Sequence, residues 1–443
     1  MQSGPFRIVE HVTPCQHIRE YPRATAEEQE TPFQLSVKQY IPLDNPNPER
    51  GDITILGAHA NGFPKELYEP LWEELHARSK KHGFRIRSVW IADVAHQGRS
   101  GVLNENDLGN DPSWMDHPRD LLHFINLKRA EMPQPIMGIA HSLGGNHLIN
   151  LSLLHPRLIT SLILLDPVVH RLQAPGEEHT FHTKECHVPL TTAASTYRRD
   201  IWPSRKAAAE ALKKSKFYQS WDPRVLDRWI RYGLRDLPTA IHPLDDHTSD
   251  SNSKGRISEE TPVTLTTSLH QEVFTFSRPS YDTNNGDPIN RLSYPDFDED
   301  TTGGHPFYRP EPPMTFAMLP HLRPSVFYVF ADKSDMCLPK ICQDKLDATG
   351  VGVGGSGGVA AGRVKSVLMK NVGHLIAMEA VGEAADRAAE WIESEIQRWK
   401  ADDKTFRDEW SKKSKIEKVT IDDEWKKHIG PPKDSGKRPK PKI

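Results

Sequence analysis

The chain has 443 residues, with 57 lysines and arginines against 60 aspartates and glutamates, and a formal net charge of −3. This near-neutral balance excludes nucleic acid as the main partner, because phosphate binding needs a basic surplus. Only 36% of the residues are hydrophobic, which predicts that part of the length lies in solvated insertions or tails. The four cysteines form no CxxC pair, so neither a disulfide scaffold nor a zinc site is expected.

The first 170 residues alternate between strand-like and helix-like patterns. Alternating or short apolar runs predict strands, and apolar residues at helical spacing predict helices. Strands are therefore expected at 33–41, 52–56, 85–92, 136–140 and 159–165, and helices at 66–82, 119–130 and 143–154. Strands that alternate with helices indicate an α/β protein with a mostly parallel sheet and helices on both faces.

The pattern changes after residue 167 and returns at residue 322. Helices are expected at 204–236, whereas 242–260 and 280–312 are rich in Pro, Asp, Ser, Asn and Gly, as loops or disordered segments are. Two more strands, 325–331 and 364–369, flank a glycine-rich loop at 350–362, and an amphipathic helix follows at 379–399. We therefore divide the chain into a core, a partly disordered inserted lid and a charged tail, with the boundaries 1–167 (core), 168–321 (lid), 322–399 (core) and 400–443 (tail).

The motif Ala140-His141-Ser142-Leu143-Gly144-Gly145 lies between a predicted strand and a predicted helix. A serine in such a sharp turn has its hydroxyl exposed above the sheet, and the turn needs small residues on both sides of the serine. Gly144 meets this need, and Ala140 stands where glycine is usual. Ser142 is therefore expected to be a nucleophile; the alternative is a serine that only caps the helix.

A serine nucleophile needs a base, and the base needs an acid that orients it. On such sheets the chain order is Ser, then Asp or Glu, then His. His374, in the loop after the last predicted strand, is the expected base. Asp335 is the favoured acid and Asp332 the alternative, because both follow the first strand after the insertion; Asp166, in an Asp-Pro turn, is an outside candidate.

The oxyanion of a tetrahedral intermediate needs two N–H donors. One is expected from Leu143, directly after the nucleophile, and the other from Phe63, where Gly62 permits an unusual backbone angle. His59, in the same loop, is interpreted as a brace that hydrogen-bonds the loop rather than as a metal ligand. The remaining histidines lack zinc-site spacing, so no metal or cofactor is expected.

Three stretches resemble one known family: residues 140–145, His59-Ala-Asn-Gly-Phe63 and Asp93-Val-Ala-His-Gln-Gly-Arg-Ser100. Together they look like α/β-hydrolase-fold enzymes of the AB-hydrolase-1 type. Residues 59–72 look closer to a fungal branch that includes peroxisomal lipase-like proteins and hydrolases of host-selective toxin biosynthesis. The resemblance covers 33–170 and 322–399 and implies an α/β-hydrolase fold with a large inserted lid.

The resemblance also implies roles for individual residues. By position, Ser142 is the nucleophile, His374 the base and Asp335 or Asp332 the acid, with Phe63 and Leu143 as oxyanion donors. The epoxide and haloalkane branches of the fold carry Asp at the nucleophile position, so Ser142 argues against their chemistries.

The expected location is peroxisomal, otherwise cytoplasmic. No secretory signal or transmembrane run is expected, because the first residues lack an apolar segment and the apolar runs are strand-sized. Pro441-Lys442-Ile443 keeps the small, basic, aliphatic order of the peroxisomal SKL address, which would make the import receptor a partner. This agrees with the peroxisomal habit of the fungal branch.

The expected function is a serine hydrolase, of esterase, lipase or thioesterase type, in secondary metabolism. It would cleave a small-molecule ester or thioester through an acyl-enzyme on Ser142. Aromatic residues of the lid suggest an apolar substrate, although ordinary helix packing explains them equally well: Trp202, Phe217, Trp221, Trp229 and Tyr232. Two alternatives stay open: an acyltransferase or cyclase that uses the same triad, and a non-catalytic ligand-binding protein on a hydrolase fold.

Overall fold

The computed structural model describes residues 2–171, 190–243, 261–280, 290–297 and 306–431. The chain forms two compact units, Met1–Glu395 and Ile396–Ile443. The first unit holds all the elements named in the site below, and each unit is described by itself.

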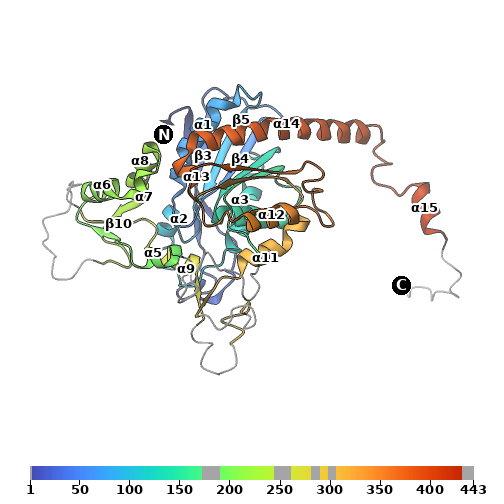
Figure 1. The fold of residues 1–443 in the computed structure, drawn as a ribbon. Coiled ribbons are helices and arrows are strands. Elements are labelled where there is room, and N and C mark those ends of the chain that lie inside the picture. Colours follow the sequence, from blue (N-terminus) through green and yellow to red (C-terminus); the bar gives the residue numbers. More distant parts are fainter. Residues whose placement is uncertain (1, 172–189, 244–260, 281–289, 298–305, 432–443) are drawn as a thin grey trace. The chain divides into compact units, whose positions relative to one another are not determined.

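A nine-stranded sheet forms the centre of the first unit, in the order β1-β2-β3-β5-β4-β6-β7-β13-β14 (Figure 1). The strands from β5 to β14 in this order are parallel, and β1, β2 and β3 pair antiparallel. Their bounds are β1 Gln2–Ser3, β2 Phe6–Pro14, β3 Gln34–Pro42, β4 Ile53–Ala58, β5 Ile86–Ala92, β6 Ile136–His141, β7 Ser161–Leu165, β13 Ser325–Ala331 and β14 Val364–Met369. The predicted mostly parallel sheet is confirmed.

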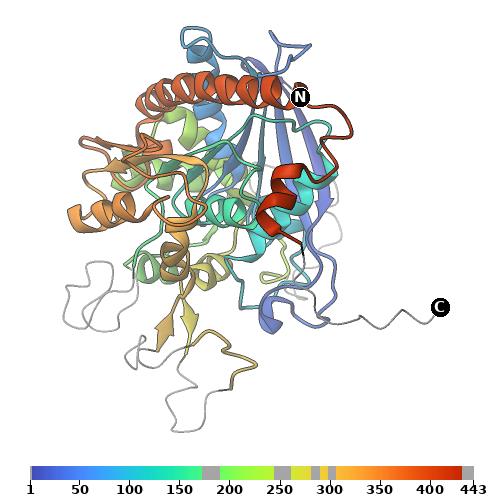
Figure 2. The same cartoon turned by 90° about the vertical axis from the view of Figure 1, so that its right-hand side faces the viewer.

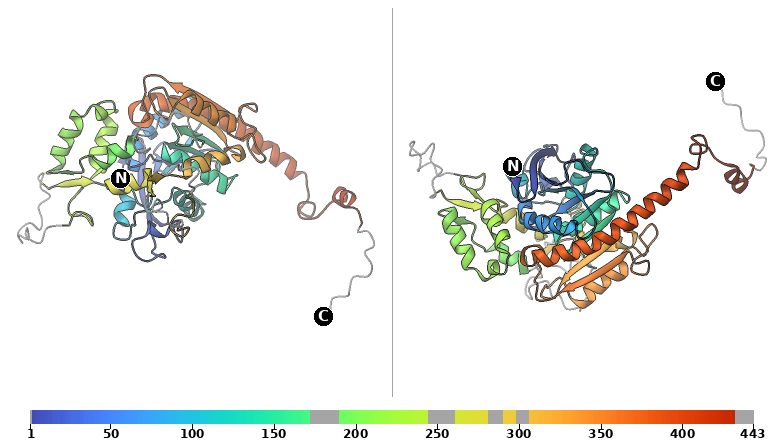
Figure 3. Two further views of the ribbon diagram at one scale, coloured as in Figure 1. Left: turned by 60° about the horizontal axis from the view of Figure 1, so that its bottom comes forward. Right: turned by 90° about the horizontal axis from the view of Figure 1, so that it is seen from above.

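Successive side chains of each strand point to opposite faces of the sheet, and helices cover both faces (Figure 2 and Figure 3). On β7, Leu162 and Leu164 join an apolar core with residues of α3 and α4. The preceding residue, Ser161, faces the other way and accepts a 2.8 Å hydrogen bond from Trp391 of α14. Because both faces are covered, β7 is apolar almost throughout, as buried parallel strands are.

The helices largely agree with the predicted positions. The predicted helix at 66–82 is a 3-10 turn followed by a shorter α-helix, and the one predicted at 119–130 begins three residues earlier and ends three residues earlier. The helical elements outside the insertion are η1 Pro22–Ala24, η2 Lys65–Tyr68, α1 Glu69–Ser79, α2 Gly98–Leu103, α3 Asp116–Leu127, α4 Leu143–Leu154, α12 Pro339–Ala348, α13 Ile376–Glu379, α14 Val381–Ser411 and α15 Asp423–Ile429.

The insertion between β7 and β13 carries its own small sheets, which the sequence did not predict. Strands β8, β10 and β9 pair antiparallel in that order, and β11 pairs with β12. Helices are present in the predicted segment 204–236. The elements are α5 Leu190–Thr196, β8 Ile201–Trp202, α6 Arg205–Lys214, α7 Lys216–Gln219, α8 Pro223–Tyr232, β9 Leu234–Asp236, β10 Val263–Leu265, α9 Leu269–Phe276, β11 Arg278–Pro279, β12 Phe307–Tyr308, α11 Glu311–Met318 and η5 Leu319–His321.

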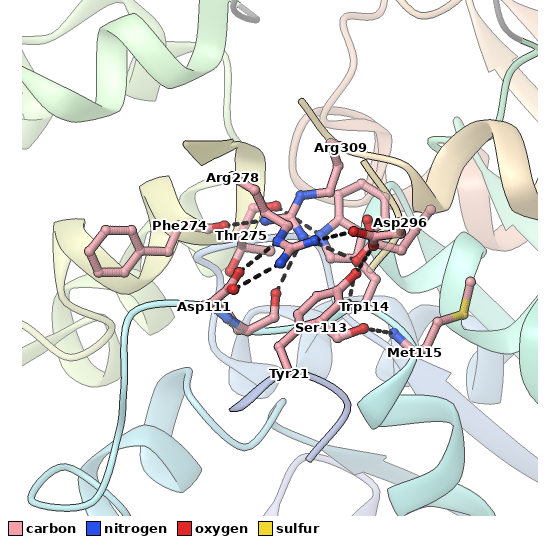
Figure 4. Close-up of polar contacts among 12 residues, drawn as sticks. Tyr21, Asp111, Ser113, Trp114, Met115, Phe274, Thr275, Arg278, Asp296 and Arg309 are labelled. Atoms are coloured by element: carbon pink, nitrogen blue, oxygen red, sulfur yellow. Dashed lines mark hydrogen bonds and ion pairs between the residues drawn. The ribbon is translucent and has the colours of Figure 1, made fainter. Parts of the chain in front are cut away.

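A buried ionic cluster joins the insertion to the core (Figure 4). Arg278 is 1% exposed, and its guanidinium donates to Asp111 Oδ1 at 2.7 Å and to Asp296 Oδ1 at 2.6 Å. Its Cζ lies 3.6 Å from the centre of the Tyr21 ring. Removing one partner of a buried ion pair leaves the other charge buried and unpaired, which is strongly destabilising. The cluster therefore holds the segment around Arg278 on the core.

The chain beyond the core differs from the expected tail in one respect. The final amphipathic helix extends to Ser411, twelve residues past its predicted end at 399, so the segment predicted as a tail begins in a helix. In the second unit, Asp422 caps α15 by accepting a 2.8 Å hydrogen bond from Trp425 N. Among the described residues, no helix has both the length and the apolar character needed to cross a bilayer.

Several predictions fall on residues outside the described ranges. These are the disorder expected in much of 242–260 and 280–312, and the address Pro441-Lys442-Ile443. The expected boundaries of core, lid and tail also stay predictions.

Candidate active site

Ser142 occupies a strained turn between β6 and α4. Its backbone has φ 55° and ψ −117°, which is a left-handed conformation that costs a non-glycine residue energy and recurs at functional sites. A Cβ at Gly144 would lie 2.3 Å from the carbonyl oxygen of Ala58, so only glycine fits there. Ala140 fits, 1% exposed, where the usual pattern has glycine. The Ser142 side chain makes no capping bond to α4, so the capping interpretation is wrong.

Three side chains that are distant in sequence are hydrogen-bonded in series at the carboxyl edge of the sheet. Ser142 Oγ lies 2.8 Å from His374 Nε2, and His374 Nδ1 lies 2.7 Å from Asp166 Oδ2. A carboxylate can only accept, so Nδ1 carries the proton and Nε2 is free to accept the Ser142 hydroxyl proton. This is the arrangement that a serine nucleophile requires.

The carboxylate that contacts His374 is Asp166, not Asp335 or Asp332. The sheet order β6-β7-β13 explains the difference, because Asp166 ends the strand next to Ser142 while the other two follow the strand beyond it. His141 pairs with Leu165 in register, so Ser142 and Asp166 stand at equivalent positions one residue later. Asp335 is exposed, and Asp332 Oδ1 is buried without a hydrogen-bond partner among the described residues. The signal in the sequence is that Asp166 directly follows the first predicted strand after the Ser142 helix, because strands joined by one helix are usually neighbours in the sheet.

Asp166 is fully buried but keeps a pKa below its ordinary value. Burial alone would raise the pKa of this carboxyl, but the hydrogen bond and charge of His374, the charge of Lys345 and the hydroxyl of Ser334 outweigh it. Ser334 Oγ donates to Asp166 Oδ2, and the buried Lys345 Nζ donates to Pro167 O at 3.1 Å. Asp166 is therefore ionised at neutral pH and can stabilise a protonated imidazole.

A second buried histidine, His141, fixes the loop that carries His374. Tyr68 OH accepts from Ala60 N at 2.8 Å and lies 3.0 Å from His141 Nδ1, while His141 Nε2 lies 2.9 Å from the carbonyl oxygen of His374. Burial lowers the pKa of His141 to about 3, so the ring is neutral. Nε2 then donates to the His374 carbonyl and Nδ1 accepts from Tyr68. No local sequence pattern predicts this role of His141.

The loop 58–63 lies across from α4 and is held by Gln97. Gly62 has φ 80°, as the prediction of an unusual angle required, and Gly62 N donates to Gln97 Oε1 at 2.7 Å. Gln97 Nε2 donates to Asn61 Oδ1 at 2.7 Å and to Thr275 Oγ1 at 3.1 Å, which links the loop to α9 of the insertion. Gln97 is completely buried, so these hydrogen bonds have no competition from water.

The two expected oxyanion donors differ in their present hydrogen bonds. Leu143 N is the first N–H of α4 and donates to no acceptor in the described part of the chain. Phe63 N donates to Ala60 O within a turn, at a long 3.3 Å. Asn61 N, in the same loop, has no acceptor among the described residues.

His59 braces the loop, as predicted. Its Nδ1 lies 2.8 Å from Ala60 O, and its Nε2 accepts from Val94 N at 2.9 Å. Burial lowers the pKa of His59 and keeps its ring neutral. Among the described residues, no group of three His, Cys, Asp or Glu side chains is arranged to hold a metal ion.

An aromatic cluster from the insertion packs against the same loop. The Phe63 ring centre lies 5.5 Å from that of Trp221 and 5.8 Å from that of Trp229. Next to Trp221, Asp222 N donates to Met378 O at 2.7 Å, which ties the cluster to α13, directly after His374. Phe217 belongs to the cluster through Trp221, with ring centres 5.7 Å apart. These contacts place apolar surface beside the elements that carry the hydrogen-bonded series.

The two other lid aromatics singled out in the sequence have different partners. Trp202 belongs to β8 and lies beside Arg199, whose Cζ is 5.7 Å from the Trp202 ring. Lys38 Nζ lies over the Tyr232 ring, 4.5 Å from the ring centre.

Comparisons with known proteins give close relatives in sequence and a match in fold. No family profile matches the chain. The sequence is 38% identical over 437 residues to the type I acyl-CoA thioesterase mpaH of Penicillium roqueforti, covering 97% of each chain. It is 26% identical over 268 residues to the abhydrolase domain-containing protein AFT2-1 of Alternaria alternata, covering 60% of this chain and 85% of the relative. The peroxisomal alpha-beta-hydrolase Lpx1 of Saccharomyces cerevisiae superposes with a TM-score of 0.64 at 16% identity, covering 94% of this chain and 100% of that chain.

Proposed function

The chain belongs to the fungal α/β-hydrolase family that includes the Penicillium type I acyl-CoA thioesterases, and on that premise we propose that it hydrolyses an acyl-CoA thioester through an acyl-enzyme on Ser142. The general reaction, hydrolysis of an ester or thioester, follows from membership of the family. The fold is that of α/β-hydrolases, as the resemblance implied. The thioester, the acyl-enzyme and the residue roles are the proposal.

One observation carries the proposal: the hydrogen-bonded series Ser142, His374 and Asp166, with heavy-atom separations of 2.8 and 2.7 Å. In the first step Ser142 Oγ attacks the thioester carbonyl while His374 Nε2 accepts its proton. Asp166 keeps the imidazole in the required tautomer and stabilises its positive charge. The coenzyme A thiol then leaves with the proton from His374, and water activated by His374 releases the acid.

The oxyanion of each tetrahedral intermediate needs donors near Ser142. We assign one to Leu143 N, because it begins α4 and is unused in the described part of the chain. The second donor comes from the loop 58–63, from Phe63 N after its long turn bond opens or from Asn61 N. The aromatic cluster of Phe63, Trp221 and Trp229 supports an apolar acyl group.

The experiment measures release of free coenzyme A by chromatography from a series of acyl-CoA thioesters of increasing chain length, beside oxygen esters of the same acids. Ser142→Ala is expected to lower kcat by about 10,000-fold or more. Ser152→Ala is the matched control, because Ser152 lies in the same helix and its hydroxyl donates to Leu148 O. Retained turnover in Ser142→Ala contradicts the proposal.

The same assay separates the alternatives. An acyltransferase gives an ester when an alcohol acceptor is added, whereas a hydrolase gives the free acid in both conditions. A binding protein retains the acyl-CoA and releases no thiol. The peroxisomal location and its import receptor stay predictions.

A further inference from the structure

Two thiols lie almost within bonding distance beside Asp166. Cys337 Sγ and Cys342 Sγ are 3.0 Å apart, about 1 Å more than a disulfide bond, and neither is bonded to another sulfur. Cys337 is partly exposed in the loop before α12, whereas Cys342 is buried in the first turns of that helix. A reagent from solvent therefore meets Cys337 first, with Cys342 placed behind it.

Both cysteines belong to elements that contact the residues around Asp166. Cys337 N donates to Ser334 O at 3.1 Å, so Cys337 closes the turn whose Ser334 hydroxyl donates to Asp166. On the other side, Cys342 lies one turn before Lys345, whose ammonium group donates to Pro167 O. A bond between the two sulfurs would thus link the turn that holds Asp166 to the helix that holds Pro167.

The surroundings favour a reactive Cys337. The hydrogen bond from the Cys342 thiol lowers the pKa of Cys337, with a further contribution from the charge of Lys345, against burial and Asp166, which raise it. The thiolate is the form that attacks peroxides, so Cys337 has the character of the attacking thiol and Cys342 that of the resolving thiol.

We propose that Cys337 and Cys342 form a peroxide-sensitive dithiol site that closes to a disulfide. In the first step the Cys337 thiolate attacks hydrogen peroxide, the O–O bond breaks, hydroxide leaves and Cys337 becomes a sulfenic acid. Cys342 sulfur then attacks Cys337 sulfur, and the sulfenic oxygen leaves as water with the Cys342 proton. The leaving hydroxide takes up the proton that the Cys337 thiol released on ionisation, so two thiols lose two electrons in total, one peroxide gains them, and two waters form.

Closure also affects the candidate active site; this part rests on the proposed function. The helix α12 is anchored by the buried Lys345, so the sulfurs approach mainly through movement of the turn 334–337. That movement weakens the Ser334 hydrogen bond to Asp166. The disulfide form is therefore expected to turn over about tenfold more slowly, the effect of losing one hydrogen bond to a charged group.

The test treats the full-length protein with hydrogen peroxide and follows the two cysteines by mass spectrometry. Trypsin cuts after Lys333, Lys340 and Lys345, so Cys337 and Cys342 fall on separate peptides, 334–340 and 341–345. The expected product is one linked pair of these peptides that dithiothreitol separates. Absence of the linked pair, with Cys337 unmodified or oxidised to sulfinic acid, overturns the proposal. This readout needs no enzymatic activity, so it stands apart from failure of the proposed function.

Turnover before and after peroxide tests the coupling to Asp166. Wild type and Cys15→Ser, which removes a buried cysteine outside the pair, are expected to lose about tenfold in kcat and to regain it with dithiothreitol. Cys342→Ser is expected to keep its initial kcat. Cys342→Ser cannot form the disulfide but retains Met336, which peroxide can also oxidise. An equal loss of kcat in Cys342→Ser and in wild type therefore comes from other oxidation and overturns the coupling of the disulfide to Asp166. Linked peptides with unchanged wild-type kcat overturn it as well.

Discussion

Two neighbouring strands of the sheet, β7 and β13, each lead into aspartates, and only one of these carboxylates meets the histidine. Asp166 after β7 is 0% exposed and hydrogen-bonded to His374, whereas Asp335 after β13 is exposed. Both strands are parallel to β6 and end at the same edge. The difference is distance across the sheet, since β7 adjoins the strand of Ser142 and β13 lies one strand further away.

The backbone at Asp166 is strained. Asp166 has φ 43°, a left-handed conformation that costs a non-glycine residue about 1–3 kcal/mol. It is held there by Asp166 N, which donates to Val329 O of β13 at 2.9 Å. The end of β13 thus supports the end of β7 through its backbone and through Ser334, while the carboxylate itself comes from β7.

Exchange of the two carboxylates for amides tests this comparison most severely. Asp166→Asn is expected to lower kcat by about 1,000- to 10,000-fold, because an amide no longer stabilises the imidazolium and can impose the wrong tautomer. Asp335→Asn, the matched substitution at the other strand end, is expected to stay within about twofold. Steady-state thioester hydrolysis measures both. A larger loss of kcat in Asp335→Asn than in Asp166→Asn would show that the catalytic acid follows β13.

A third strand end, that of β5, contributes through Gln97. Gln97→Leu is expected to lower kcat about 10- to 100-fold with a smaller change in KM, because the loop 58–63 loses the acceptor of Gly62 N and the link to Asn61. Gln271→Leu is the control, since Gln271 also hydrogen-bonds the insertion to the core, through Gly109 O, away from the loop. Equal losses in both variants would assign the effect to the insertion and not to the loop.

The support that β13 gives Asp166 can be removed by itself. Ser334→Ala is expected to reduce kcat about tenfold, because Asp166 Oδ2 loses a hydrogen bond that favours its ionised form. Its effect should vanish in the Asp166→Asn background, since the two residues act through one contact. Additive losses in the double variant would show that Ser334 acts elsewhere.

Lowering the pH destabilises the folded chain at His141, at the end of β6, in a pH range above that in which ordinary carboxylates become protonated. His141 has a pKa of about 3 in the folded chain, below its ordinary 6.5, so the unfolded chain binds a proton there that the folded chain does not. The stability from neutral His141 is therefore complete above the unfolded pKa and lost as pH falls toward about 3, at about 1.4 kcal/mol per pH unit.

Urea unfolding at about pH 6.5 and about pH 5 measures this loss. His141→Gln should lose about 2 kcal/mol less than wild type over the interval, which is the share of one proton. His428→Gln, at an exposed position of α15, should follow wild type. A wild-type slope in His141→Gln would show that this ring does not stay neutral.

The sequence predicted those parts of the site that depend on local pattern. Ser142 was found because a strand, a turn and a helix follow one another with small residues in place, and His374 because it follows the last strand. Asp166 is only an outside candidate in the sequence because Asp-Pro is typical of a turn, and its contact with His374 depends on which strands are neighbours in the folded sheet. Gln97 and His141 were missed because a buried polar side chain shows its partners only once the loops have met.

The long strands of the central sheet could be predicted from the sequence, whereas β2 and the short strands of the insertion could not. The seven central-sheet strands that the sequence predicted have apolar patterns that reflect burial on one or both faces: β3, β4, β5, β6, β7, β13 and β14. By contrast, β2 lies between the two-residue edge strand β1 and β3, and it alternates buried and exposed residues in a stretch that carries several charged and polar residues. The small sheets of the insertion have strands of two or three residues, too short for any periodicity to register.

Acylation of Ser142 is measured by the mass of the protein after rapid mixing with an acyl-CoA and quenching in acid. An acyl group is expected on the tryptic peptide 130–157, which contains Ser142, and is expected to be absent in Ser142→Ala. In Asp166→Asn the adduct should form far more slowly, and in Asp335→Asn at the wild-type rate. If the wild type turns over the thioester while Ser142 is never acylated, and Ser142→Ala turns it over equally fast, then Ser142 is not the nucleophile.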